Sequence, residues 1–128
     1  MSETVYTMGT WLVKQGSEQE FVDRWTELAR WSKAAFEGAL PVQLLRNEAN
    51  SARFISVGPW RSLEDVQTWR SSEGFQQRIA ALKPLLEHFE PGLLRCVFLA
   101  SPAARVQIRY EQSTRVDGRC ARVGACRV

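Results

Sequence analysis

The stretch that most constrains the fold is residues 54–89, which combine a strand, two helix starts and two tryptophans in one run of sequence. Its first residues alternate like a β-strand, and Pro59 is expected to end the pairing, so that the next residue lies on a turn. Ser62 and Asp65 have the spacing of a capping box, which predicts a short helix ending near Trp69. Any ligand pocket is expected to begin in this stretch.

A longer helix and a last strand are predicted after the short helix. Residues 71–72 restart the chain into this helix, whose apolar positions recur at helical spacing. These positions are Phe75, Ile79, Leu82 and Leu86. Pro84 removes a hydrogen bond within the helix and predicts a kink or a restart just before it. A turn at residues 91–92 is then expected to lead into a strand over residues 93–100, with Cys96 as a small buried residue.

The first forty residues predict a strand followed by a helix. Residues 4–13 alternate as a strand whose two faces are both largely apolar, so each face is expected to be covered. Gly9 in its middle leaves a gap over which a neighbour or a ligand could approach. Ser17 and Glu20 have capping-box spacing and predict a helix start. Trp31 lies off the apolar stripe of this helix and could be an edge residue, a subunit contact or a pocket wall.

The order of the elements predicts the fold class. Residues 42–49 and 53–58 are typical of a hairpin around a tight turn. The order is therefore β-α-β-β-α-β, which predicts an α+β, ferredoxin-like fold with an antiparallel four-stranded sheet and helices on one face. The other face carries Tyr6, Met8 and Leu12 and is too apolar to remain exposed to water. Two copies packed face to face, as a dimeric α/β barrel, would cover it.

Composition and cysteine usage favour one globular domain in the cytoplasm. The chain has 128 residues, of which 45% are hydrophobic and 24% charged, a balance typical of folded domains. No apolar run approaches the roughly 20 residues that span a bilayer, and the N-terminus does not have the pattern of a secretory signal. We therefore expect no membrane partner. Three cysteines without metal-type spacing, including Cys120 and Cys126, indicate reduced thiols and no metal site.

The positive charge is concentrated at the C-terminal end. Residues 105–128 contain six arginines and two acidic residues, a local charge of +4, so the rest of the chain carries −1 of the total of +3. We therefore do not expect a nucleic acid as partner. The domain is expected to occupy residues 1–102. The basic tail, residues 103–128, could add one strand and is otherwise expected to be loosely ordered.

The predicted topology and one spaced motif resemble a known family. The motif is W-x-S-x-E…W…F, formed by Trp60, Ser62, Glu64, Trp69 and Phe75. Together they resemble the antibiotic biosynthesis monooxygenase (ABM) family of the dimeric α/β-barrel superfamily, over about residues 4–100. The resemblance implies a homodimer. It also implies one of several activities, since the family includes cofactor-free oxygenases of polycyclic aromatics, quinol monooxygenases, haem-degrading enzymes and members without assigned activity.

The resemblance to the haem-degrading branch is incomplete. That branch uses an asparagine on the first strand, a tryptophan on the short helix and a histidine on the next helix. Trp69 matches the tryptophan, whereas Gly9 stands at the asparagine position and Arg78 with Ile79 at the histidine position. Without an imidazole the iron has no obvious axial ligand. We therefore expect no haem cofactor.

The polyketide-oxidising branch provides the candidate catalytic residues. The chain resembles that branch at Trp60 and at Arg78, its helix arginine. Ser56 stands in place of its strand asparagine, and Val66 in place of its helix tyrosine. The resemblance implies that Trp60 stacks on the substrate and that Arg78 stabilises negative charge, with His88 or a water as the base.

Five more residues are candidates for the site, and a second function is also consistent with the sequence. The residues expected to contact the substrate are Trp69, Ser56, Gly9, Trp11 and Trp31. The function expected is the oxidation of an electron-rich aromatic or quinol molecule without any cofactor. In the alternative, the tryptophans are core residues, Arg78 is a salt-bridged helix residue and His88 is a surface residue. The protein is then a non-catalytic dimeric barrel that binds a small apolar ligand or a partner.

Overall fold

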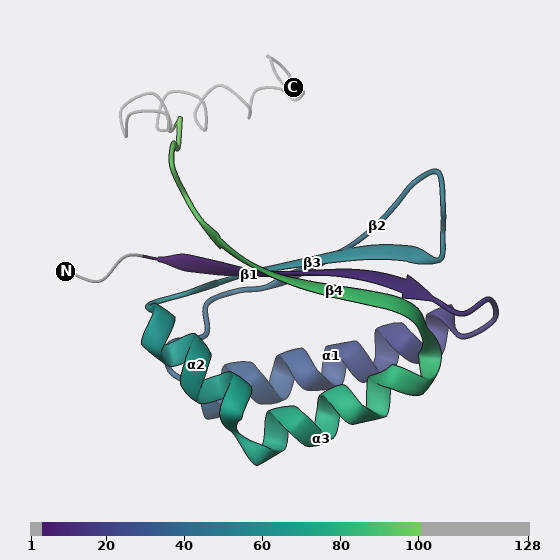
Figure 1. Cartoon of the computed structure of the whole chain (residues 1–128), viewed down its shortest axis with the longest axis horizontal. Coiled ribbons are helices and arrows are strands. Elements are labelled where there is room, and N and C mark those ends of the chain that lie inside the picture. The colour runs from purple at the N-terminus through teal and green to yellow at the C-terminus, as the bar shows by residue number, and fades with distance from the viewer. Residues whose placement is uncertain (1–3, 101–128) are drawn as a thin grey trace, which may run out of the picture. The chain divides into compact units, whose positions relative to one another are not determined.

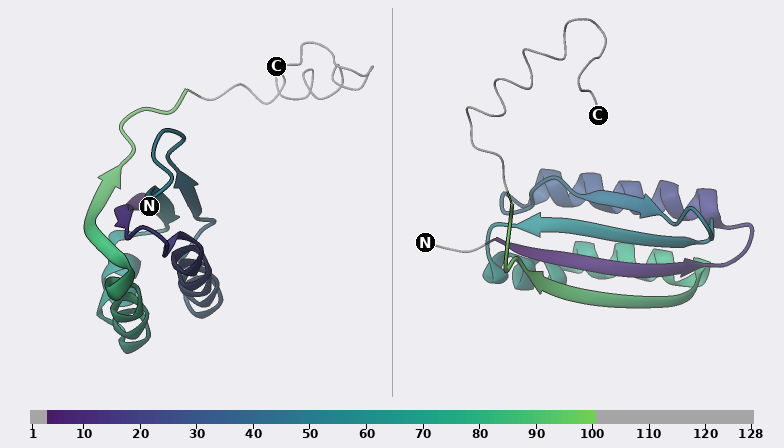
Figure 2. Two further views of the ribbon diagram at one scale, coloured as in Figure 1. Left: turned by 90° about the vertical axis from the view of Figure 1, so that its right-hand side faces the viewer. Right: turned by 90° about the horizontal axis from the view of Figure 1, so that it is seen from above.

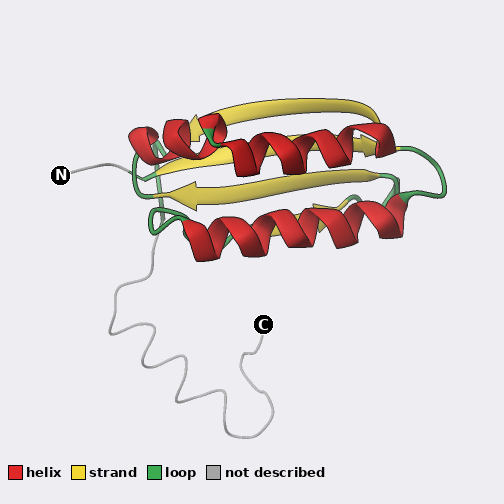
Figure 3. Cartoon of the chain, turned by 90° about the horizontal axis from the view of Figure 1, so that it is seen from below, coloured by secondary structure: helices red, strands yellow, loops and turns green. Residues whose placement is uncertain are grey.

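The computed structural model describes residues 4–100 and shows a four-stranded antiparallel sheet with all its helices on one face (Figures 1 and 3). In chain order the elements are β1 (Val5–Val13), α1 (Glu18–Ala35), β2 (Gln43–Arg46), β3 (Arg53–Trp60), α2 (Leu63–Ser71), α3 (Glu73–Leu82), the 3-10 helix η1 (Lys83–Leu85) and β4 (Leu86–Arg95). The strand order is β2-β3-β1-β4. The predicted α+β, ferredoxin-like fold is confirmed. The predicted extra strand of the tail lies outside the described residues.

The two faces of the sheet differ because alternate residues of β1 point to opposite sides. Trp11 and Val13 face the helices and are buried, at 4% and 2% exposure. Trp11 stands opposite Phe54 of β3 and Phe89 of β4, and its ring stacks on that of Phe89 with centroids 4.1 Å apart. The main core therefore lies between β1 and the helices, and Phe21 of α1 is fully buried in it.

Serine side chains cap the N-termini of α2 and α3; the cap at Ser62 was predicted, whereas at residues 71–72 only a restart of the chain was. The hydroxyl oxygen of Ser62 accepts the backbone N–H of Asp65 at 3.1 Å. The same contact joins Ser72 to the N–H of Phe75 at 3.2 Å. The predicted cap at Ser17 is wrong, because its side chain makes no capping hydrogen bond. The Glu18 carboxylate instead accepts the N–H of Gly16, which holds the loop before α1.

The boundary between α3 and β4 also differs from the prediction. The expected restart near Pro84 is present as the single turn η1. The chain then becomes extended at Leu86, which had been assigned to the helix. Residues 91–92, predicted as a turn, lie inside β4, where Pro91 pairs with Gly9. A proline fits there because β4 is an edge strand. Cys96 follows the strand and is exposed, not buried.

A second proline, Pro59, does not end β3 as predicted. It pairs with Tyr6, and its carbonyl oxygen accepts the N–H of Leu40 at 3.0 Å. The pairing of β2 with β3 stops at Val57, so the missing N–H of Pro59 interrupts no bond to that neighbour. The next residue, Trp60, therefore belongs to the strand and not to a turn, and it lies on the face that the helices cover.

The described helices are short and mixed in polarity. Within residues 4–100, every helix is too short or too polar to cross a lipid bilayer. Seen from above, the strands lie in front of the helices. The face of the sheet that points away from the helices therefore has no helix over it (Figure 2). This helix-free face is called the outer face below.

Candidate functional site

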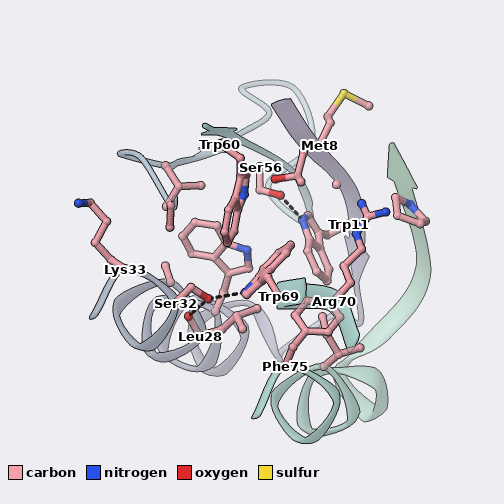
Figure 4. Close-up of a pocket in the computed structure, with 18 of the residues that line it drawn as sticks. Met8, Trp11, Leu28, Ser32, Lys33, Ser56, Trp60, Trp69, Arg70 and Phe75 are labelled. Carbon is pink, nitrogen blue, oxygen red and sulfur yellow. Dashed lines mark hydrogen bonds between the residues drawn. The ribbon is translucent and has the colours of Figure 1, made fainter. Parts of the chain in front are cut away.

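A cavity of about 320 Å³ lies between the helix-covered face of the sheet and the helices (Figure 4). Its walls are mostly aromatic and aliphatic. The aromatic residues that line it are Trp11, Trp25, Trp60, Trp69, Phe75 and Phe89. Small-molecule sites usually have roughly 300–1,000 Å³ of space and mainly apolar walls with a few polar groups. The cavity therefore has the size and the lining of a small-molecule site.

One wall is formed by Trp60 of β3 and Trp69 of α2. Their ring centroids are 4.7 Å apart, with the planes tilted by 39°. Trp69 is held from two sides, because its ring contacts Phe75 at 4.5 Å and its indole N–H donates to the hydroxyl of Ser32 at 2.8 Å. The Ser32 hydroxyl donates in turn to the carbonyl oxygen of Leu28 at 2.8 Å. The ring of Trp69 is thus fixed before any ligand binds.

A second part of the lining is formed by β1 and β3, where Trp11 and Ser56 meet beside Gly9. The indole N–H of Trp11 donates to the hydroxyl oxygen of Ser56 at 3.0 Å, and Ser56 stands directly opposite Gly9 in the ladder. A Cβ atom at Gly9 would come within 2.7 Å of the Trp11 indole nitrogen and 2.9 Å of the Ser56 oxygen. The gap expected at Gly9 is therefore filled by the indole of Trp11, and only glycine leaves room for this hydrogen bond.

Buried hydrogen-bond donors without acceptors accompany these walls. Trp60 and Trp25 are 4% and 8% exposed, and no residue within 4–100 accepts a hydrogen bond from either indole N–H. Ser56 is 9% exposed and accepts from Trp11, while its own proton has no acceptor in the same part of the chain. An unpaired buried donor costs about 1–3 kcal/mol. A bound molecule with an acceptor atom within reach of these donors would remove this cost.

The structure brings together five of the residues predicted for the site. Gly9, Trp11, Ser56, Trp60 and Trp69 all line the cavity. In Figure 4, Ser56 lies between Trp60 and Trp11, and Trp69 lies below them toward α1 and α3. The other three predicted residues are outside the cavity lining. They are Arg78, Trp31 and His88.

Arg78 and Trp31 join α1 to α3 outside the cavity. The guanidinium carbon of Arg78 lies 4.2 Å from the ring centroid of Trp31. Its Nε donates to the carboxylate of Glu27 at 3.1 Å, and its Nη1 to the carbonyl oxygen of Gly74 at 3.1 Å. A Cβ at Gly74 would come within 2.2 Å of Trp31, so the ring packs directly on the backbone of α3. Trp31 is therefore an edge residue between two helices.

His88 also lies away from the cavity. It belongs to β4 and stands opposite Leu12, whose side chain is on the outer face. Its side chain is 63% exposed, and its Nε2 lies 4.0 Å from a carboxylate oxygen of Glu90. Neither Arg78 nor His88 places a reactive group near a ligand bound between the tryptophans, so their catalytic roles remain predictions from the resemblance alone.

The helices contribute polar groups to the cavity that were not predicted from the sequence. Ser32 lies on the buried side of α1 among apolar residues, and a serine in that position is itself a sign of a buried polar contact. Lys33 and Arg70 line the cavity and were not singled out, although Arg70 directly follows Trp69. Among the described residues that line the cavity there is no aspartate, glutamate, histidine, tyrosine or cysteine.

Metal binding receives no support from the described part of the chain. Within residues 4–100 no three histidine, cysteine, aspartate or glutamate side chains are grouped so that they could hold a metal ion. Cys120 and Cys126 lie outside the described residues. The polar side chains of the described residues that line the cavity are hydroxyls, one amide and two cations, which are not a usual set of metal ligands.

The fold, the aromatic cavity and the spaced tryptophans define a class of protein. The family model described as antibiotic biosynthesis monooxygenase matches residues 4–81. The chain therefore belongs to the antibiotic biosynthesis monooxygenase family, and the resemblance drawn from the sequence is confirmed. No curated protein matches the sequence.

Solved structures of similar fold include three examples from bacteria. SnoaB, a cofactor-independent oxygenase of Streptomyces nogalater crystallised as a mutant, has a TM-score of 0.72 and 20% identity, over 79% of this chain and 100% of its own. A second structure of SnoaB has a TM-score of 0.66 and 21% identity, over 80% and 98%. A candidate antibiotic biosynthesis monooxygenase of Caulobacter crescentus has a TM-score of 0.70 and 20% identity, over 76% and 92%. At these identities the likeness shows the fold alone.

Proposed function

We propose that this protein is an ABM-type monooxygenase that oxidises an electron-rich aromatic or quinol molecule in the cavity, without a cofactor, as a cytoplasmic homodimer. The observation that carries the proposal is the unpaired indole N–H of Trp60 inside an aromatic cavity of a family member. SnoaB, which has the same fold, is named as a cofactor-independent oxygenase, and this supports the absence of a cofactor in the proposal.

The protein does not have to supply electrons to dioxygen, because the substrate supplies them. An activated ring CH₂ group reacts with one O₂ to give a ring carbonyl and one water. The substrate loses two hydrogen atoms, gains one oxygen atom and supplies the four electrons that reduce O₂. The first step is loss of a proton to give an enolate or phenolate, which then reduces dioxygen. The N–H of Trp60 and the hydroxyl of Ser56 can stabilise the negative oxygen of that anion. The aromatic walls orient the flat ring system and exclude water from it.

The absence of a carboxylate or imidazole among the described residues of the lining restricts the substrate. We therefore assign proton removal to water in this proposal, and this requires a substrate acidic enough to ionise without a strong protein base. Anthrone-type compounds meet this condition better than alkyl aromatics, because the anion formed at their CH₂ group is delocalised over the aromatic rings and the carbonyl. Hydroquinones are about as acidic as simple phenols and are favoured over them only because their anions give up electrons to dioxygen more readily.

Oxygen uptake with matched variants tests the proposal. A hydroquinone or an anthrone is added to enzyme free of flavin and metal, and dioxygen consumption is followed. Wild type is expected to consume one dioxygen for each anthrone converted to anthraquinone. A hydroquinone has no CH₂ group, and its oxidation to the quinone reduces dioxygen to hydrogen peroxide instead. Trp60→Phe keeps an aromatic ring but removes the N–H, and removing one such donor typically costs roughly 10²–10³ in turnover. Trp31→Phe makes the same change outside the cavity and should retain wild-type turnover. Inactivity of wild type, or full activity of Trp60→Phe, contradicts the proposal.

The alternative is a non-catalytic protein that binds an aromatic ligand in the same cavity. The lining without acidic residues or histidine, in the part of the chain described, favours this alternative. It predicts that hydroquinones or their oxidised products bind with no dioxygen consumed above the rate in buffer. Calorimetric titration beside the oxygen measurement separates the two functions, because binding without uptake supports only the second.

A further inference from the structure

The charged side chains that line the cavity are all cations in the part of the chain that the structure describes. They are Lys33 of α1 and Arg70 of α2. Neither side chain forms an ion pair within residues 4–100, whereas Arg24 pairs with Glu20 and Arg78 with Glu27. Two cations without an ion pair beside an aromatic cavity favour a positive potential there, and among the described residues no carboxylate belongs to the lining.

Of the two cations, Arg70 lies closer to the tryptophans. Figure 4 shows its side chain extending from α2 toward the sheet beside Trp11, on the side of that ring away from Trp60, whereas the Lys33 side chain points away from the cavity. Arg70 is half-buried, and Lys33 is exposed. A cation that is partly removed from water interacts more strongly with an anion than one in full contact with solvent.

Hydrogen bonds fix the backbone around Arg70, and they do not involve its guanidinium. Its carbonyl oxygen accepts the side-chain amide of Gln76 at 2.7 Å, and the Ser72 hydroxyl donates to the carbonyl of Trp69 at 2.7 Å. These two contacts hold the junction between α2 and α3. No hydrogen bond within residues 4–100 uses the guanidinium itself, so its donors remain unassigned.

We propose that Arg70 makes the cavity selective for aromatic acids, by binding a carboxylate on the ring system that lies between the tryptophans. A guanidinium presents parallel N–H donors whose spacing matches a carboxylate. The other open groups of the cavity, the N–H of Trp60 and the hydroxyl of Ser56, are also donors and match further ligand oxygens. This inference names the substrate class for the site of the proposed function and rests on that site, but it concerns binding and not turnover.

Calorimetric titration with a matched pair of ligands, carried out in the absence of dioxygen, tests the inference. The pair is a hydroxynaphthoate and its methyl ester, which have nearly the same shape but differ in charge. Wild type is expected to bind the acid more tightly than the ester, with an affinity for the acid that falls as salt rises. Arg70→Gln should weaken acid binding by about 10-fold to 100-fold, the usual range for a lost charged hydrogen bond, and leave the ester unchanged.

Two further variants make the result specific. Arg61→Gln removes an exposed arginine that does not line the cavity, and it should bind both ligands as wild type does. Arg70→Lys keeps the charge but loses the paired donors, and its affinity for the acid should lie between those of wild type and Arg70→Gln. All variants are first compared with wild type by circular dichroism and thermal unfolding.

Several results would overturn the inference. They are equal affinity of wild type for acid and ester, no binding of either ligand, equal loss for both ligands in Arg70→Gln, and the same loss in Arg61→Gln. The proposed function fails separately, in the oxygen measurement. Arg70-dependent binding of the acid without dioxygen uptake supports the inference and contradicts the monooxygenase.

Discussion

At the scale of single residues, the site depends on contacts that residue type alone does not reveal. The sequence marked Gly9, Trp11, Ser56, Trp60 and Trp69, and all five line the cavity. Their side-chain partners could not be predicted, because the bond from Trp11 to Ser56 joins two strands and depends on register. Arg70 was missed because one arginine on a short helix resembles any solvated arginine until its surroundings are known.

Gly9→Ala is predicted to damage both the fold and the cavity. The new Cβ would meet the Trp11 indole and the Ser56 hydroxyl at less than normal contact distance, so one of them must move. A loss of about 1–3 kcal/mol in the free energy of unfolding is expected from such overpacking. Gly92→Ala is the matched control on the neighbouring strand, since its Cβ would lie 3.7 Å from Met8, in ordinary contact. Urea unfolding of both variants checks this, and equal stabilities would contradict it.

At the scale of elements, the sequence predicted their order better than their ends. Serines followed three residues later by a helical N–H located the starts of α2 and α3, because this capping contact is local. Pro59 and Pro91 were both misjudged, because a proline is compatible with a strand wherever its missing N–H faces no partner. Whether that holds is decided by strand order, which is a tertiary property.

The contact between α1 and α3 gives an element-scale prediction about Arg78. Arg78→Ala removes both its stacking on Trp31 and its ion pair with Glu27. We expect a loss of about 1–2 kcal/mol in unfolding free energy, with oxygen uptake by the folded enzyme unchanged. The catalytic role drawn from the resemblance predicts a large loss of turnover instead. Glu27→Gln serves as the control, since it breaks the ion pair but keeps the stacking, and it should cost less than Arg78→Ala.

At the scale of the whole molecule, the outer face of the sheet carries apolar side chains in contact with solvent. Leu45 is 50% and Leu94 44% exposed, and the ladder places both on the same face as Tyr6 and Thr10. The partner that covers this face was inferred from the sequence alone and remains a proposal. The helix-covered face, by contrast, was predicted correctly, because the stripe of α1 and the alternation of β1 match each other.

The homodimer is tested through Val57, which lies between Met8 and Gln43 on the outer face. Light scattering of wild type at micromolar concentration should give about twice the chain mass of 14.6 kDa. Val57→Glu should abolish the dimer, since a second copy would bury its charge. Leu63→Glu introduces the same charge at an exposed leucine of α2 and should leave the mass unchanged. A stable wild-type monomer would exclude the dimeric barrel.

The distribution of the tryptophans has a practical consequence for spectroscopy. The chain has five tryptophans, and four of them, Trp11, Trp25, Trp60 and Trp69, line the cavity. Trp31 is the remaining one and lies between the two helices, beside a cation. In a Trp31→Phe background, every photon that the protein emits under indole excitation comes from a ring at the ligand site. Such a variant reports occupancy of the cavity directly through its fluorescence, without any attached dye.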